Sequence, residues 1–313
     1  MQKISILLFF FILPLAFADL QVGFYGSTCP KAESIVKQAV QKRFNRDKSI
    51  TAALLRMHFH DCFVKGCDAS LLIDSTNTST GEKETGADAS VRGYDLIDEA
   101  KKSLEAACPS TVSCADIIAL ATRDTVALSG GPKYNVPTGR RDGLVANSDV
   151  DLPGPTTPVS QARSIFANKG LTTEEMVTLL GAHTVGVAHC GFFSGRLSSS
   201  GTPDPTMDPA LDAKLVKLCK SAGNPAAFLD QNTSFIVDNQ FYKQILLKRG
   251  IMQIDQQLAL DPSTKPFVSG FAANGAKFQK SFANALIKMG KIGALVGNQG
   301  EIRKNCRVFN KGS

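Results

Sequence analysis

Apolar residues recur at three- and four-residue spacing along most of the chain, which is the pattern of amphipathic helices. The helices that this spacing predicts lie at 33–44, 50–60, 94–107, 115–128, 211–218, 240–248 and 278–289. A further helix is expected after Thr172, because the residues from Thr172 to Glu175 have the form of a capping box. Alternation with period two is rare. The pattern therefore predicts an all-α protein, with the proline-rich segment 150–158 as the joint between two lobes.

The amino terminus has the form of a secretory signal peptide. Lys3 precedes a short apolar run at 6–13, and Ala16-Phe17-Ala18 supplies a small-residue cleavage site. We therefore expect residues 1–18 to be a signal peptide and the mature chain to be secreted. The apolar run is too short for a transmembrane helix, and no later segment approaches ~18 uninterrupted apolar residues, so no membrane is expected as a partner.

Composition narrows the class of protein further. The 313-residue chain is 43% hydrophobic and 20% charged, which excludes a disordered chain, a collagen-like chain and a polytopic membrane protein. Its net charge of +7 comes without basic runs, so nucleic acid is not an expected partner. All eight cysteines lie in the mature part, and in an exported protein this even number predicts four disulfides of undetermined pairing. Asn77 and Asn232 begin glycosylation acceptor sequences.

The segment 54–70 carries a pair of side chains suited to acid–base chemistry. Arg56 and His60 are four residues apart on a predicted helix and so project from the same face. A guanidinium close to an imidazole disfavours protonation of the imidazole, so His60 is expected to be a neutral base. Arg56 can stabilise a developing negative charge. The alternative is a helix whose arginine and histidine only pair with carboxylates.

Two other sets of residues suggest ligands for a metal and for a cofactor. Asp61, Asp68 and Ser70, with the carbonyls of the intervening loop, supply the hard oxygen ligands that calcium takes. His183 ends an apolar helix, and the small residues around it in 180–186 would let a flat ligand approach closely. The alternative for His183 is a histidine satisfied within the core.

Several longer motifs resemble those of the secretory plant peroxidases, also called class III peroxidases. They are RMHFHDCFV at 56–64, GCDAS at 66–70, VSCAD at 112–116, GRRD at 139–142 and GAHT at 181–184. The resemblance runs from Phe24 to Arg307 and implies one haem peroxidase domain over 19–313. It implies a haem b between two helical lobes. The distal lobe would comprise about 19–150 with the carboxy-terminal segment tied to it by Cys306, and the proximal lobe about 151–295.

The resemblance also implies roles for residues on both sides of the haem. His183 would be the iron ligand, and Asp255 would accept the proton on its other ring nitrogen. Arg56 and His60 would be the catalytic residues of the distal pocket, which move the proton of hydrogen peroxide and stabilise the separating charge. Phe59 would shield the iron from bulky donors.

Two calcium sites and one disulfide pairing are implied as well. The distal site would comprise Asp61, Val64, Gly66, Asp68 and Ser70, and the proximal site Thr184, Asp230, Thr233, Ile236 and Asp238. Val64, Gly66 and Ile236 would contribute carbonyl oxygens. The implied disulfides are Cys29–Cys108, Cys62–Cys67, Cys114–Cys306 and Cys190–Cys219.

Three positions depart from the family pattern. Asp88 stands where the family has an asparagine that accepts a hydrogen bond from the distal histidine, Leu229 stands where many members have phenylalanine, and Tyr134 where many have tryptophan. If Asp88 is ionised and reaches His60, we expect the pKa of His60 to be raised. Two alternatives stay open: Asp88 is protonated in a dry pocket, or it faces solvent while Ala87 faces the histidine.

These observations predict a secreted haem peroxidase of the cell wall that reduces hydrogen peroxide to water and oxidises small phenolic donors in one-electron steps. The donors are expected to dock at Pro153, and the protein is expected to be a monomer with one haem b and two calcium ions. One alternative is a haem-containing wall-binding protein whose catalysis is impaired by Asp88, which guaiacol turnover would distinguish. Another is a disulfide-stapled structural protein without cofactor, which would lack Soret absorption.

Overall fold

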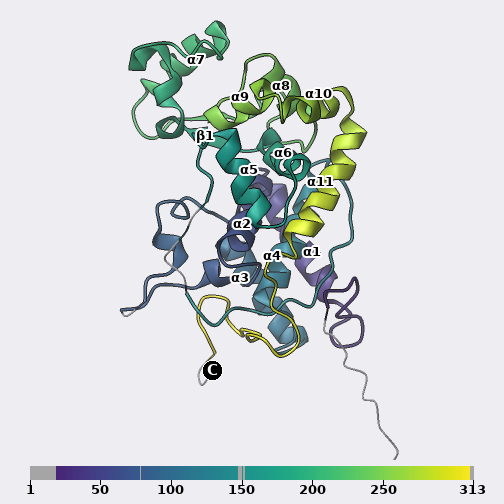
Figure 1. Cartoon of the computed structure of the whole chain (residues 1–313). Coiled ribbons are helices and arrows are strands. Elements are labelled where there is room, and N and C mark those ends of the chain that lie inside the picture. The colour runs from purple at the N-terminus through teal and green to yellow at the C-terminus, as the bar shows by residue number, and fades with distance from the viewer. Residues whose placement is uncertain (1–18, 78, 147–149, 151, 311–313) are drawn as a thin grey trace, which may run out of the picture.

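The computed structural model describes residues 19–77, 79–146, 150 and 152–310, so the predicted signal peptide lies outside the described residues. Helices dominate this part of the chain (Figure 1). They are α1 (Ala32–Arg46), α2 (Ile50–Val64), α3 (Tyr94–Ala107), α4 (Cys114–Leu128), α5 (Val159–Asn168), α6 (Thr173–Leu180), α7 (Pro209–Cys219), α8 (Gln240–Leu246), α9 (Gln253–Leu260), α10 (Lys265–Ala273) and α11 (Gly275–Met289). The short strands β1 (Val187–His189) and β2 (Ala226–Phe228) pair antiparallel, with Val187 opposite Phe228.

Short 3₁₀ helices connect several of these elements. They are η1 (Ser70–Leu72), η2 (Glu82–Glu84), η3 (Gly181–Thr184), η4 (Cys190–Phe192), η5 (Ser194–Arg196) and η6 (Ser198–Ser200). The expectation of a mainly helical protein is confirmed. Among the described residues no helix is both long and apolar enough to cross a membrane.

The helices expected from apolar spacing are all present, with boundaries that differ by a few residues. The capping box at the start of α6 is also present: the Thr172 hydroxyl accepts from the N–H of Glu175 at 3.2 Å, and the Glu175 carboxylate accepts from the N–H of Thr172 at 2.7 Å. Helices α5, α9 and α10 were not expected from the apolar pattern. Buried polar residues interrupt that pattern in α9, where Asp255 and Gln256 face the interior.

Helix α2 is central to the molecule because it packs on both sides. Its Leu54 and Met57 belong to a core shared with α1, α3 and α4, whereas its Leu55 and Phe63 belong to a second core with α5, α6 and α8–α11. A helix that is apolar around most of its circumference is expected to be buried in this way. The polar side chains that α2 carries, including His60, are therefore held between two packed cores. The division into two lobes with the boundaries given above stays a prediction.

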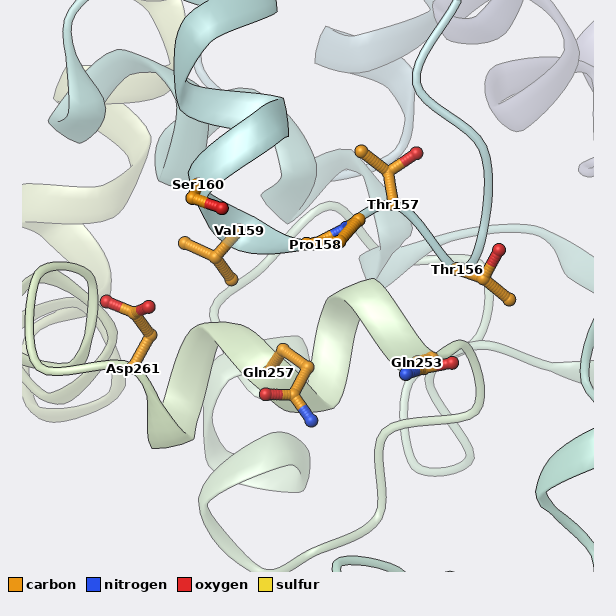
Figure 2. A pocket seen from close by; sticks show the side chains of 8 residues that line it. All are labelled: Thr156, Thr157, Pro158, Val159, Ser160, Gln253, Gln257 and Asp261. Carbon is orange, nitrogen blue, oxygen red and sulfur yellow. The ribbon is translucent and has the colours of Figure 1, made fainter.

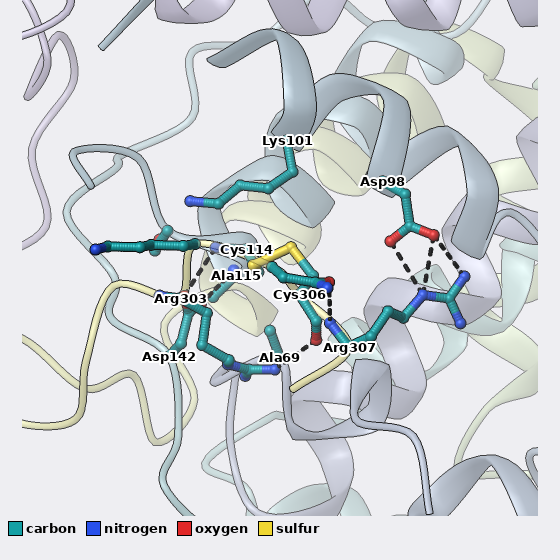
Figure 3. The surroundings of a disulfide bond; sticks show 12 residues. Ala69, Asp98, Lys101, Cys114, Ala115, Asp142, Arg303, Cys306 and Arg307 are labelled. Atoms are coloured by element: carbon teal, nitrogen blue, oxygen red, sulfur yellow. Dashed lines mark hydrogen bonds and ion pairs between the residues drawn. A yellow bond between two sulfur atoms is a disulfide. The ribbon is translucent and has the colours of Figure 1, made fainter. Parts of the chain in front are cut away.

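Four disulfides join the chain in the expected pairing: Cys29–Cys108, Cys62–Cys67, Cys114–Cys306 and Cys190–Cys219. Figure 3 shows the surroundings of the longest-range bridge, which joins residues 192 apart in sequence. Beside it, the Asp142 carboxylate accepts from the N–H groups of Cys114 and Arg303 at 3.1 and 2.9 Å. The carboxy-terminal segment is thereby fixed to the start of α4 (Figures 1 and 3).

Candidate active site

Arg56 and His60 meet on the same face of α2, as their spacing predicts. The guanidinium Nε of Arg56 lies 3.2 Å from Nε2 of His60 and donates a hydrogen bond to it. Two other guanidinium nitrogens donate to the carbonyl of Ala87 at 2.6 Å and to the hydroxyl of Ser90 at 2.9 Å. These partners lie about 30 residues farther along the chain, and no sequence signal indicated them. They orient Arg56 toward the histidine.

Asp88 reaches His60 from the same loop. Nδ1 of His60 donates a hydrogen bond to Oδ1 of Asp88, and both side chains are buried. The hydroxyl of Thr85 lies 3.4 Å from the other carboxylate oxygen and donates to it. The alternative in which Asp88 faces solvent and Ala87 faces the histidine therefore does not hold, because the Ala87 carbonyl is bound by Arg56.

The pKa of His60 moves in the direction opposite to the one expected from Asp88. Burial lowers the pKa of His60 below its ordinary value, the hydrogen bond and charge of Asp88 raise it, and Arg56 lowers it again. The net direction is downward because desolvation of the imidazolium is the largest contribution. Asp88 therefore acts in the expected sense, but the burial of His60 outweighs it. The hydrogen bond to Asp88 fixes the tautomer of His60, because Nδ1 carries the proton and Nε2 is left as the acceptor.

Phe59 lies beside this pair and is held by other rings. Its ring centroid is 4.2 Å from that of Phe63 and 6.2 Å from that of Phe166, which belongs to α5. It meets His60 edge-on at 5.8 Å. Phe59 is half-buried, so part of its ring remains free beside the distal histidine.

The second histidine region brings His183 and Asp255 together. Helix α6 continues into η3, which carries His183, and α9 carries Asp255. Nδ1 of His183 donates to Oδ1 of Asp255 at 2.8 Å, and Asp255 is 1% exposed. Gly181 makes this placement feasible, because a Cβ there would lie 2.2 Å from the hydroxyl oxygen of Tyr242. Nε2 of His183 has no hydrogen-bond partner among the described residues, and 27% of the side chain is exposed.

This donor set fits a haem iron. An imidazole with one nitrogen held by a buried carboxylate and the other nitrogen free is the usual arrangement of an iron-ligating histidine. Helix α2, with Arg56 and His60, packs against η3, with His183. The two histidine regions that are 123 residues apart in sequence therefore belong to neighbouring elements.

The residues expected at the distal calcium site form a cluster of buried oxygens after α2. Asp61 and Ser70 are 0% exposed, and the Oδ2 atom of Asp61 and the hydroxyl of Ser70 have no hydrogen-bond partner. Burial, Asp68 and Glu82 raise the pKa of Asp61 well above its ordinary value. Buried carboxylates that repel one another in this way are stabilised by a cation. The carbonyl of Val64 accepts from the ammonium group of Lys169 at 3.2 Å, and the carbonyl of Gly66 from the N–H of Asp68 at 2.7 Å.

The residues expected at the proximal calcium site also converge. The Thr184 hydroxyl lies 3.3 Å from a carboxylate oxygen of Asp230, 3.4 Å from the carbonyl of Ile236 and 3.2 Å from a carboxylate oxygen of Asp238. The Thr233 hydroxyl bonds with the same two carboxylates at 2.9 and 3.1 Å. Five oxygen ligands from two segments, η3 and the loop between β2 and α8, thus gather next to His183, and this set also fits calcium.

Four other residues that the sequence singles out are buried or half-buried. Pro153 is half-buried in the loop before α5, and Leu229 is buried beside the β1–β2 pair. The phenol oxygen of Tyr134 is buried without a partner. His58 is buried with both ring nitrogens unpartnered, and burial together with Arg140 lowers its pKa to about 3. These residues lie outside the two histidine clusters described above.

Comparison with known proteins agrees with this geometry. The family model described as peroxidase matches residues 36–274. The chain is 58% identical to Peroxidase 57 of Arabidopsis thaliana, over 98% of this chain and 97% of that protein, and 59% identical to Peroxidase 44 of Arabidopsis thaliana, over 97% of each. It is 48% identical to Peroxidase 5 of Vitis vinifera, over 94% of this chain and 92% of that protein. With the distal Arg56–His60 pair and the proximal His183–Asp255 pair in place, the chain belongs to the peroxidase family and is a plant peroxidase of the class III type.

Proposed function

We propose that this peroxidase is exported to the cell wall, where it reduces hydrogen peroxide to water with His60 and Arg56 as its catalytic pair and oxidises small phenols. The observation that carries the assignment is the position of His60, whose Nδ1 is bound by Asp88 and whose Nε2 faces the guanidinium of Arg56. One peroxide and two phenols yield two waters and two phenoxyl radicals, so each phenol loses one electron and one proton.

The iron ligand in this proposal is Nε2 of His183. A bound haem supplies the two-electron reduction of peroxide and the two one-electron oxidations. Asp255 holds the ring orientation of His183 and makes its free nitrogen more basic, because it accepts a hydrogen bond of 2.8 Å from Nδ1. The edge of Phe241 packs against the imidazole at 6.0 Å and limits rotation of the ring.

The proton transfer falls to His60. Burial keeps the imidazole neutral, so Nε2 can accept a proton from peroxide and return it to the departing oxygen. Arg56 stabilises the negative charge that develops between these two events. The hydrogen bond between Arg56 and His60 has to open when peroxide reaches Nε2. Asp88 keeps the ring oriented during this exchange, since it binds Nδ1.

Two calcium ions complete the proposed cofactor set. The distal ion would bind Asp61, Val64, Gly66, Asp68 and Ser70, and the proximal ion Thr184, Asp230, Thr233, Ile236 and Asp238. Each site adjoins a functional histidine in sequence, because Asp61 follows His60 and Thr184 follows His183. The cations would therefore fix the backbone next to His60 and His183 and so hold both imidazoles in position.

Sequence features and exposure support export and the donor site. The signal-like terminus and the exposed Asn77 and Asn232 suit a secreted glycoprotein. Pro153 is half-buried, so part of it can be reached by a phenol from solvent, and we propose it as the docking point of the donor. A monomer is proposed as well, and no cysteine of the described residues is free to link two chains.

Stopped-flow kinetics of the haem-loaded protein tests the function. His60→Ala should slow the bimolecular reaction with peroxide by ~10²–10⁴-fold, which is the usual contribution of general acid–base catalysis. His189→Ala is the matched control, because the ring of His189 forms a hydrogen bond with the carbonyl of Asn224, outside both histidine clusters. A His60→Ala rate within a few-fold of wild type would overturn the assignment. Absence of guaiacol turnover by the wild type would favour the haem-containing wall protein with impaired catalysis.

A further inference from the structure

A polar pocket lies outside the histidine clusters, between the loop that follows Pro153 and helix α9 (Figure 2). Its volume is about 310 Å³, at the lower end of small-molecule sites. The loop and the start of α5 supply Thr156, Thr157, Pro158, Val159 and Ser160, and α9 supplies Gln253, Gln257 and, at its end, Asp261.

The polar groups of this pocket are free to bind a ligand. The side chains of Thr156, Ser160, Gln253 and Gln257 have no hydrogen-bond partner among the residues that the structure describes. Thr157 accepts from the N–H of Gly154 at 2.8 Å, which leaves its hydroxyl proton available. Amides and hydroxyls that both donate and accept suit a ligand with several hydroxyl groups, because each hydroxyl also does both.

Charge restricts the ligand further. Among the lining residues only Asp261 is charged, and the hydroxyl and N–H of Ser263 bind its carboxylate and hold the pKa of Asp261 below its ordinary value. A fixed negative charge accepts hydrogen bonds from hydroxyls and repels carboxylates. No aromatic side chain lines the pocket, so an aromatic ring would gain little there. A neutral sugar meets all three conditions.

The pocket adjoins the proposed docking point of the phenol. The N–H of Thr157 donates to the carbonyl of Gly154 at 3.1 Å, which closes a turn from Gly154 to Thr157. The turn brings the pocket-lining Thr157 next to Gly154, the residue that follows Pro153. The carbonyl of Pro155 accepts from the N–H of Ile254 at 2.9 Å and holds this loop on α9.

Helix α9 connects the pocket with the proximal histidine. Gln253 and Gln257 are each two residues from Asp255, so they project about 200° away from it around the helix. Asp255 is buried against His183, whereas Gln253 is exposed and Gln257 half-buried. One face of α9 therefore serves the iron ligand while the other face lines the pocket.

We propose that this pocket binds the neutral sugar of a donor in which a phenolic acid is esterified to that sugar, with the phenol at Pro153. This inference rests on the proposed phenol oxidation and names its substrate class. The ester leaves the phenol hydroxyl free to lose its electron and proton, and it removes the carboxylate that Asp261 would repel. A sugar linked through the phenol oxygen itself would block the oxidation.

The test compares the free acid, the methyl ester and the glucose ester of one hydroxycinnamic acid as donors of the haem-loaded full chain. In the wild type the KM of the glucose ester should lie about tenfold below that of the methyl ester, as one or two net hydrogen bonds imply. In the double variant Gln253→Ala/Gln257→Ala this ratio should fall toward one. Gln38→Ala, which removes an exposed glutamine from α1, should keep the tenfold ratio. Asp261→Asn should lower the KM of the free acid relative to the methyl ester.

Saturation-transfer NMR with methyl glucoside and the resting holoenzyme tests the pocket without peroxide or phenol. A transfer signal that the double variant loses supports the inference. Equal KM values for the two esters in the wild type would overturn it, as would a preference that survives in the double variant. If none of the three phenols is oxidised, the proposed function fails instead, and the NMR signal still decides whether the pocket binds sugar.

Discussion

Asp88 accepts a hydrogen bond from Nδ1 of His60, so the distal histidine has a carboxylate on one ring nitrogen and the guanidinium of Arg56 on the other. The two neighbours act on the imidazole in opposite directions: Asp88 stabilises its protonated form and Arg56 destabilises it. Burial adds to the effect of Arg56 and is the largest of the three. The base strength of His60 therefore depends on a balance that a single substitution can shift.

Asp88→Asn should move the acid limb of the peroxide reaction to lower pH. The carboxylate raises the pKa of His60, so its loss lets the imidazole stay neutral and basic at a more acidic pH. The displacement measures the stabilisation of the imidazolium that is lost together with the carboxylate. The measurement is the stopped-flow bimolecular rate against pH for both proteins. Superimposable acid limbs would show that the Asp88 carboxylate is not coupled to His60.

His183→Ala should leave the protein folded but reduce its haem content to roughly one tenth or less, because metal–ligand affinity is lost together with the ligand. The pyridine haemochrome assay, expressed as haem per chain, measures this. His189→Ala is the control and should retain full haem. Full occupancy with an unchanged Soret band in His183→Ala would assign the iron to another residue.

Removal of calcium should destabilise the protein. Without a cation, Asp230 and Asp238 hold their carboxylates around the same two threonine hydroxyls, and Asp61 is buried near Asp68. At a free calcium concentration of about 100 times each Kd, the two sites together add ~5 kcal/mol to the free energy of unfolding. Exhaustive chelation should therefore lower the thermal midpoint by roughly 10 °C. Calcium, but not magnesium, should restore it. An unchanged midpoint after calcium loss is verified by elemental analysis would refute both sites.

His58 should make the protein sensitive to acid. Its pKa falls from 6.5 to about 3 on folding because the ring is buried and faces Arg140. A lowered pKa gives stability that is present above pH 6.5 and is lost as the pH falls toward 3, since only the unfolded chain binds the proton in that window. Between pH 6.5 and pH 4 the free energy of unfolding should decrease by ~3 kcal/mol through His58 alone.

Replacement by a residue that does not titrate tests this expectation. Thermal unfolding of wild type and His58→Leu at pH 7 and pH 4 should show a smaller decrease of the midpoint in the variant. Even if the variant is less stable at pH 7, the difference between the two pH values reports the titration. Equal decreases in the two proteins would assign the acid sensitivity to other groups.

The protein should resist cross-linking by the radicals that it forms. The chain has no tryptophan, and all four of its tyrosines have shielded phenol oxygens. The phenol hydroxyl of Tyr25 donates to the carboxylate of Asp116, and that of Tyr242 donates to the carbonyl of Val177. The phenol oxygens of Tyr94 and Tyr134 are buried without a hydrogen-bond partner. We expect neither dityrosine fluorescence nor covalent dimers during turnover of a small phenol. Phe228→Tyr, at a site 41% exposed, is the positive control. Dimers of the wild type would contradict the expectation.

The sequence by itself determined the elements that depend on local rules. Apolar spacing predicted α1–α4, because a helix that buries one face carries apolar residues at three- and four-residue intervals along the sequence. The capping box at Thr172 and the i, i+4 relation of Arg56 and His60 are equally local, and the structure contains both. Long motifs that resemble those of the class III peroxidases indicate the family and the pairing of the four disulfides without the tertiary structure.

Only the tertiary structure decided what depends on segments far apart in the chain. Helix α9 was missed because its buried face carries Asp255 and Gln256, whose partners lie on other elements, so no apolar stripe marks it. The pKa of His60 could not be given a sign from Asp88 alone, because the largest contribution is the burial that two packed cores impose on α2. The pocket between the loop after Pro153 and α9 likewise exists only because folding places two polar surfaces, roughly 100 residues apart in sequence, side by side.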